Sequence, residues 1–120
     1  MELDSKDERF IDLLAEAGLN RNIARVIVYL SKVGEAVSRD IEREANLRQP
    51  EVSLAMKDLK ALGWIKEKEI KKKGKGRPLK SYKLSLDIRD IVRELVEKKR
   101  DELNKLEKEL EELEKLVGLK

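Results

Sequence analysis

The stretch over residues 48–84 decides the fold and reads RQPEVSLAMKDLKALGWIKEKEIKKKGKGRPLKSYKL. Residues 50–62 carry apolar side chains at helical spacing, and Gly63 is a typical residue just after the end of a helix. Two runs of strand type follow, at 64–70 and 79–84, and the second alternates apolar with polar residues. The glycine-containing basic turn KKKGKGRP joins them. We therefore expect a helix followed by a β-hairpin.

Two helices are expected ahead of this stretch. Ser5 and Glu8 have the spacing of a capping box, so a first helix is predicted over 5–17, with an apolar stripe at positions 10, 13, 14 and 17. A second helix, capped by Asn22 or Asn20, runs to about residue 33. Its apolar residues cover much of its circumference, which is typical of the central helix of a domain.

A short third helix is predicted to begin at Ser38, with acidic residues in its first turn, where they stabilise the positive end of the helix dipole. Asn46 and Leu47 form a tight turn, because Asn tolerates the left-handed backbone conformation. Pro50 then starts the next helix, since a proline at the first helical position lacks only an amide that would have had no partner. Two helices joined by a turn of about three residues have helix-turn-helix spacing.

A single long helix is expected from about 87 to 117, because neither glycine nor proline interrupts it. Its apolar residues recur at alternating steps of four and three, which is a heptad pattern broken only by Lys99. The expected fold is mainly α with a small β-hairpin (α+β): a winged helix-turn-helix domain over 1–86 and a dimerisation helix over 87–120. The predicted dimer interface is a coiled-coil seam of Val92, Val96, Leu103, Leu106, Leu110, Leu113 and Val117.

Flanking charges favour an antiparallel pairing of this helix with a second copy. A parallel dimer would bring two pairs of glutamates together. An antiparallel dimer with Leu103 in the same layer as the partner's Leu106 leaves one repulsive pair and forms two attractive ones, each worth only about a few tenths of a kcal/mol. The attractive pairs would be Arg93 with Glu114 and Arg100 with Glu107.

The composition excludes several classes of function. At 120 residues the chain is expected to form one domain with an appended helix. It contains no cysteine or histidine, which excludes disulfides and thiolate metal sites and removes the commonest general base. The glycines of the basic turn are not those of a P-loop, and the carboxylates lie among lysines at helical surface spacing. We expect no enzyme, no metal and no cofactor.

Charged residues make up 44% of the chain, against ~25% in a typical domain. Abundant Lys, Glu and Arg with few labile residues indicate a thermophile, although a long charged helix would also raise the count. No apolar run is long enough to span a membrane, and the acidic, polar start is unlike a signal peptide. A cytoplasmic protein is expected.

The basic residues are concentrated in one segment. Residues 66–83 carry nine lysines and arginines and two glutamates, although the whole chain has a net charge of only +3. Such a local excess is the footprint of a polyanion-binding surface, here double-stranded DNA. The outer face of helix 50–62 carries residues that can hydrogen-bond base edges. The candidate DNA-binding residues are Ser38, Arg39, Arg48, Gln49, Ser53, Lys57, Lys60, Lys71, Lys72, Lys73, Lys75, Arg77 and Lys80.

Three motifs, QPEVS at 49–53, LKALGWI at 59–65 and GRPLKSYKL at 76–84, resemble archaeal winged-helix transcription regulators of the MarR/TrmB-like and ArsR-like group. The resemblance implies a recognition helix at 50–62 in the major groove, a wing at 71–80 on the backbone or minor groove, and a homodimer. Leu54 stands where such proteins often carry Arg or Lys.

A dimeric transcription regulator is therefore the expected function. Metal sensing of the ArsR type is excluded, because the chain has no Cys or His ligands, and no residue pattern identifies a small-molecule effector. Two alternatives remain: a non-specific architectural or chromatin DNA-binding protein, and a protein-interaction module that uses the same elements without DNA.

Overall fold

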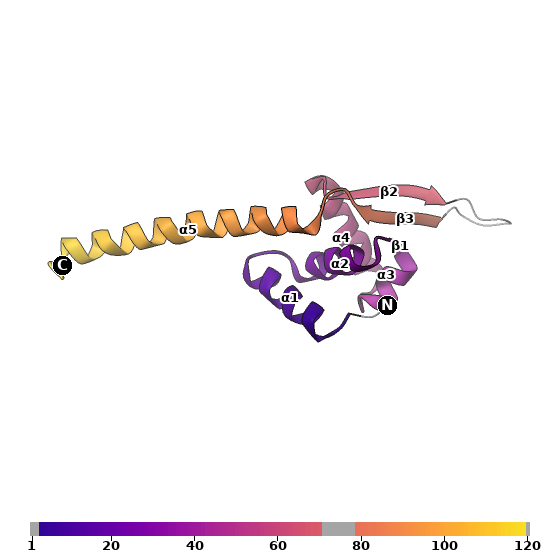
Figure 1. Cartoon of the computed structure of the whole chain (residues 1–120), viewed down its shortest axis with the longest axis horizontal. Coiled ribbons are helices and arrows are strands. Elements are labelled where there is room, and N and C mark those ends of the chain that lie inside the picture. The colour runs from indigo at the N-terminus through magenta and orange to yellow at the C-terminus, as the bar shows by residue number, and fades with distance from the viewer. Residues whose placement is uncertain (1–2, 71–78, 120) are drawn as a thin grey trace.

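The computed structural model describes residues 3–70 and 79–119. The described part is mainly helical, with one small antiparallel sheet and a long C-terminal helix (Figure 1), which confirms the expected fold class. The elements are α1 (Ser5–Glu16), α2 (Arg21–Val33), β1 (Glu35–Val37), α3 (Ser38–Glu44), α4 (Gln49–Leu62), β2 (Ile65–Ile70), β3 (Leu79–Leu84) and α5 (Ile88–Leu116).

Helix α2 is the centre of the domain, as its apolar circumference predicts. Seven of its residues are buried, and Ala24, Val26 and Ile27 have no exposed surface. The other elements pack around it, with α1 on one side, α4 on another and the sheet on a third (Figure 1). Because apolar burial stabilises folding in proportion to the area removed from water, this layer of contacts supplies most of the driving force.

The sheet has the strand order β1-β3-β2, and both pairings are antiparallel. The hairpin register runs from Ile65 opposite Leu84 to Ile70 opposite Leu79. Strand β1 was not expected, because three residues are too few to show an alternating pattern; its pairing with β3 creates it. The predicted first strand residue, Trp64, lies before β2, where its carbonyl accepts a hydrogen bond from the Ser85 amide at 2.8 Å.

Two of the predicted helix starts need correction, and the structure decides between the two alternatives offered for a third. Asp4 and Asp7, and not Ser5 and Glu8, form the capping box of α1. The carboxylate of each aspartate accepts a hydrogen bond from the backbone amide of the other at 2.9 Å. Both pairs have the same three-residue spacing, so spacing alone did not distinguish them. Asn20 rather than Asn22 caps α2. Helix α4 begins one residue before Pro50.

The predicted apolar stripe of α1 divides between two environments. Leu14 is buried in the core together with Ile11, whereas Leu13 is 51% exposed and Phe10 is half-buried. The core therefore takes only one side of the stripe, because α2 lies against that side alone. The other side remains available for a different contact.

Helix α5 starts on the domain and then leaves it. Asp87 caps it by accepting a hydrogen bond from the Arg89 amide at 2.8 Å, and the side-chain and amide hydrogen bonds of Arg89 lower the pKa of Asp87 to about 2. Ile91 is the one buried residue among those described in α5. The rest of the helix projects from the domain (Figure 1), and the molecule measures 76 × 28 × 24 Å. No helix in the described ranges combines the length and apolar character needed to cross a membrane.

Ile91 should be the residue that holds α5 to the domain. Replacing it by alanine removes a side chain with no exposed surface and should lower the free energy of unfolding by about 2–5 kcal/mol, because a cavity remains in the core. Urea unfolding followed by circular dichroism measures this loss. Glu94→Ala, an exposed change one turn further along α5, is the control and should change stability by less than about 0.5 kcal/mol.

Candidate nucleic-acid interface

Helices α3 and α4 form a helix-turn-helix with the turn predicted from the sequence. Asn46 has a φ of 55°, the left-handed conformation expected of it. The Leu47 amide donates to the Glu42 carbonyl at 2.9 Å, which closes the end of α3, and the Leu47 side chain is buried. The inward face of α4 is packed in the core through Val52, Ala55, Met56 and Leu59. This packing turns the opposite face of α4 outward.

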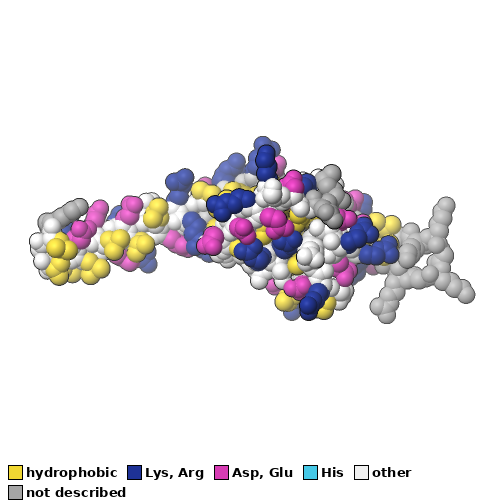
Figure 2. All heavy atoms as spheres, turned by 90° about the horizontal axis from the view of Figure 1, so that it is seen from below, with side chains coloured by type: hydrophobic (Ala, Val, Ile, Leu, Met, Phe, Trp, Pro, Cys, Tyr) yellow, Lys and Arg dark blue, Asp and Glu magenta, His cyan; other side chains and the backbone are white. Residues whose placement is uncertain are grey.

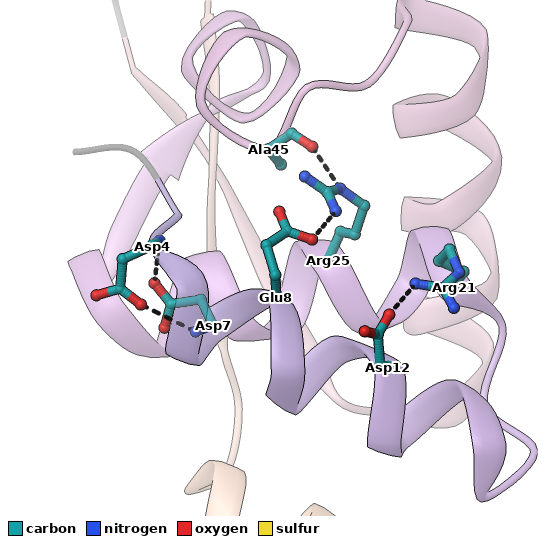
Figure 3. A network of polar contacts seen from close by, with 7 residues as sticks. All are labelled: Asp4, Asp7, Glu8, Asp12, Arg21, Arg25 and Ala45. Carbon is teal, nitrogen blue, oxygen red and sulfur yellow. Dashed lines mark hydrogen bonds and ion pairs between the residues drawn. The ribbon is translucent and has the colours of Figure 1, made fainter.

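Arg25 of α2 holds the turn between α3 and α4 in place (Figure 3). Its Nε donates to the Ala45 carbonyl at 2.7 Å, and its Nη1 contacts the Glu8 carboxylate of α1 at 2.9 Å. The Arg25 side chain is only 16% exposed, so these charge-assisted bonds are shielded from water. The sequence analysis missed this residue. An arginine within the otherwise apolar run of residues 23–30 was the signal that could have found it.

A second set of bonds fixes the N-terminus of α4. The Glu51 carboxylate accepts a hydrogen bond from the Arg48 backbone amide at 2.9 Å and another from the Asn22 side-chain amide of α2 at 3.3 Å. One side chain therefore caps α4 and links it to the central helix. The orientation of the outward face of α4 is fixed at this end by the bond to α2, independently of what that face binds.

The outward face of α4 carries the predicted residues. Arg48, Gln49, Ser53, Lys57 and Lys60 are all exposed. The structure brings two of them together, because the Gln49 Nε2 donates to the Ser53 Oγ at 2.7 Å. These are also the two uncharged polar groups proposed to contact base edges, so a ligand would have to replace or extend this bond.

Two apolar side chains of α4 are also exposed. Leu54, at the position where related regulators often carry a cation, is 61% exposed. Leu62 is 50% exposed, although its helical spacing had placed it in the buried stripe. It lies in the last turn of α4, where Gly63 adopts a left-handed conformation with φ 75° and directs the chain toward β2.

Glu67 of β2 joins the end of α4 to both strands of the hairpin. Its carboxylate contacts the Lys60 Nζ at 2.7 Å and the Lys80 Nζ of β3 at 3.3 Å. The hydrogen bond from Lys60, followed by that from Lys80, lowers the pKa of Glu67. Beside it, burial raises the pKa of Tyr82, and the Glu67 charge raises it further. Two predicted DNA-binding cations are thus held together by one carboxylate.

The other face of the hairpin is also basic. Lys66 lies directly opposite Lys83 in the β2–β3 register, and Lys68 forms an ion pair with Glu35 of β1 at 3.1 Å. The lysine contacts, Lys68 first, lower the pKa of Glu35, and Ser81 adds a further hydrogen bond. None of these three lysines was among the candidate residues, although they belong to the same basic segment.

The remaining candidate residues lie at the edges of the interface. Ser38 and Arg39 form the first turn of α3, and the Arg39 side chain is exposed. The predicted wing cations Lys71, Lys72, Lys73, Lys75 and Arg77 lie outside the described residues. Lys80, at the start of the returning strand β3, is described and is placed beside α4 by Glu67.

Comparisons with solved structures identify the fold as a winged helix of the kind seen in MarR/TrmB-like regulators. A possible transcriptional regulator from Methanosarcina mazei Go1 aligns with a TM-score of 0.60 at 19% identity, over 82% of this chain and 85% of that one. A MarR-family regulator from Neisseria meningitidis aligns with a TM-score of 0.53 at 20% identity, over 82% and 68%. At these identities the likeness concerns the fold.

The archaeal chromatin protein TrmBL2 aligns with a TM-score of 0.54 at 22% identity, over 93% of this chain. This chain spans 41% of the length of TrmBL2. No protein-family model matches the sequence, and no curated protein matches it.

Removing the Glu67 charge should strengthen binding to DNA of any sequence. Glu67→Gln releases Lys60 and Lys80 for phosphate contacts, so the affinity should rise and the log–log salt dependence should steepen by up to about 0.9 per added contact. Fluorescence anisotropy with duplexes of random sequence at several salt concentrations measures both quantities. Glu69→Gln makes the same charge change at an exposed position on the same strand. Equal effects of the two variants would contradict the role given to Glu67.

Proposed function

We propose that this chain is a homodimeric transcription regulator that binds double-stranded DNA. In this proposal α4 lies in the major groove, and the basic wing contacts the backbone or the minor groove. The arrangement at Glu67 is the main support for this proposal. The ion pairs of Glu67 link the end of α4, the outward-facing helix of the helix-turn-helix, to the hairpin. Residues 66–83 of this hairpin include nine basic and two acidic residues. A helix of this width fits the major groove, and dense cations beside it match the phosphates.

The residues fall into two roles. Gln49 and Ser53 carry uncharged polar groups on the outward face of α4, and such groups contact base edges. Lysine and arginine residues around them neutralise phosphates, which positions the protein without reading sequence. The phosphate-contacting set comprises Ser38 and Arg39 of α3, Arg48 just before α4, Lys57 and Lys60 of α4, Lys80 of β3, and Lys71, Lys72, Lys73, Lys75 and Arg77 of the wing.

The projecting part of α5 supports the dimer. Leu103, Leu106, Leu110 and Leu113 are each at least half exposed along one face of this helix. A soluble monomer rarely leaves such a continuous apolar stripe in water. The flanking charges favour an antiparallel coiled coil in which Leu103 lies in the layer of the partner's Leu106.

A non-specific architectural role is the second candidate. The two proposed base-contacting side chains are hydrogen-bonded to each other, and Leu54 takes the place of a cation. A chromatin protein is also among the proteins that share this fold. Selection of bound duplexes from random DNA separates the two functions, because only a specific regulator enriches a consensus sequence.

Substitutions of phosphate-contacting residues and of base-contacting residues should have different effects on DNA binding. Lys72→Ala and Arg77→Ala should weaken binding to all sequences alike and reduce the salt slope by about 1 each, since each removes a phosphate contact. Gln49→Ala and Ser53→Ala should instead change sequence preference by about 1–3 kcal/mol at a base pair, if each contacts one. Binding isotherms on selected and random duplexes measure the division. Equal losses on both duplexes for all four variants would contradict specific recognition.

The antiparallel dimer also predicts the spacing of the two half-sites. At 1.5 Å per residue, the register places the first residues of the two α5 helices roughly 50 Å apart. Helix α4 lies at that end of α5 (Figure 1), so the two recognition helices are more than one DNA turn of about 34 Å apart. Because half-sites of a symmetric dimer are separated by whole turns of the duplex, selected sites should show half-sites about two turns apart. Half-sites centred one turn apart would contradict this register.

A further inference from the structure

Leu54 is a large exposed apolar side chain that the proposed dimer does not account for. Most of the other such side chains among the described residues lie in or just after α5, and Figure 2 shows hydrophobic side chains gathered at the free end of that helix. A second α5 would cover them. Leu54 is 61% exposed and lies instead on α4, in the helix-turn-helix. Its exposure therefore calls for a different partner.

Leu54 lies near the middle of the outward face of α4. With 3.6 residues per turn, successive residues are about 100° apart around the helix axis. The buried residues of the helix point to one side of it: Val52, Ala55, Met56 and Leu59. The opposite side is shared, within about 30°, by Pro50, Leu54, Lys57 and Ala61. These four residues, the central strip of the face, are all exposed, and only the lysine has a hydrogen-bonding group in its side chain.

Polar residues flank the central strip on both sides. On the side toward the hairpin lie Ser53 and Lys60, and the Lys60 Nζ contacts Glu67 of β2 at 2.7 Å. The Ser53 hydroxyl accepts a hydrogen bond from Gln49. On the other side lies Asp58, whose exposed carboxylate suits the amino group of a cytosine and repels phosphate. In the proposed complex, the central strip therefore meets base edges rather than the DNA backbone.

We infer that Leu54 contacts the C5-methyl group of a thymine in the major groove, so that each half-site carries a T·A pair at one fixed position opposite α4. The inference rests on the proposed function, in which α4 lies in the major groove, and it names a feature of the DNA that this helix selects. The C5-methyl of thymine is the apolar group that unmodified base pairs present in this groove. A leucine in contact with it distinguishes T·A from the other pairs.

A leucine at this position selects its base pair in two ways. Contact with the thymine methyl removes apolar surface from water, and burial of one methyl-sized group changes an affinity by about threefold to fivefold. Against a G·C pair, the same side chain would cover hydrogen-bonding atoms of the base edge without replacing their bonds to water, which is unfavourable. A cation at this position would instead bind guanine or phosphate. Leu54 can bind neither, because it has no charge and no hydrogen-bonding group.

Replacing thymine by uracil tests the contact, because uracil lacks only the C5-methyl group and presents the same acceptor in the major groove. Duplexes selected from random DNA are synthesised again with one uracil at a time. Fluorescence anisotropy with the full-length protein measures their dissociation constants. We expect one thymine in each half-site to respond, with binding about threefold to fivefold weaker for uracil.

Leu54→Ala assigns this response to the side chain. Alanine ends at Cβ, so the variant should bind the thymine and uracil duplexes equally. Leu62→Ala is the matched control, since Leu62 is an exposed leucine of the same helix that points about 110° away from the middle of the outward face. This control should keep the preference for thymine. Neither variant changes a charge, so the salt dependence of binding should stay that of the native protein.

5-Methylcytosine provides a second test that does not depend on uracil. Replacing the responsive T·A pair by C·G should weaken binding. 5-Methylcytosine at that position should then recover about threefold to fivefold in affinity, because it returns a methyl group to the same place in the groove. The recovery should be absent in Leu54→Ala. An equal recovery in that variant and in the native protein would overturn the inference, because another group would then contact the methyl.

Failure of this inference and failure of the proposed function give different results. A selected consensus in which no thymine responds to uracil, or a response that Leu54→Ala retains, would overturn the thymine contact and leave the specific regulator standing. Uniform binding to all duplexes would overturn the contact together with sequence-specific recognition, and DNA binding itself would stand. Absence of binding at about 50 mM salt, where phosphate contacts are strong, would overturn both and would favour a protein partner for Leu54.

Discussion

The need to cover α2 on every side organises this protein. A helix with seven buried residues among thirteen has almost no face for water, so α1, α4, the sheet and the start of α5 must pack around it. Each of these elements has one apolar side and turns its other side outward. The outward face of α4 is therefore a consequence of how the core is filled.

Polar contacts then fix the orientation of the elements that the core has placed. Arg25 holds the turn before α4 to α2 and α1, while Glu51 links the first turn of α4 to α2. At the other end, Glu67 of β2 joins α4 to β3 through two lysines. Helix α4 and the described strands of the hairpin thus form one surface, and the same carboxylate that positions the two lysines also reduces their combined charge.

The apolar surface that the domain leaves uncovered is the other consequence. One domain of this size covers one side of α1 and the first turns of α5, and the remainder of both stripes stays exposed. In the proposed dimer, a second α5 covers the exposed leucines of this helix and sets the distance between the two proposed DNA-binding surfaces.

Much of this could be predicted from local patterns. Apolar periodicity identified the long helices, and the glycine and proline positions identified their approximate ends, because these signals act over a few residues. The strand-type runs at 64–70 and 79–84 identified the two strands of the hairpin for the same reason. The helix-turn-helix followed from the length of its turn and from Asn46, whose conformation the structure confirms.

Only the tertiary structure decided which of several alternatives with the same local sequence pattern occurs in the folded protein. Asp4 and not Ser5 caps α1, Leu13 and Leu62 face outward within apolar stripes, and β1 exists because β3 lies beside it. The contacts of Arg25 and Glu67 join residues far apart in sequence, so no local pattern contains them. The chain by itself determined the elements and their charge, because these depend on neighbouring residues. Packing determined which faces meet, because that depends on shape and on every other element at once.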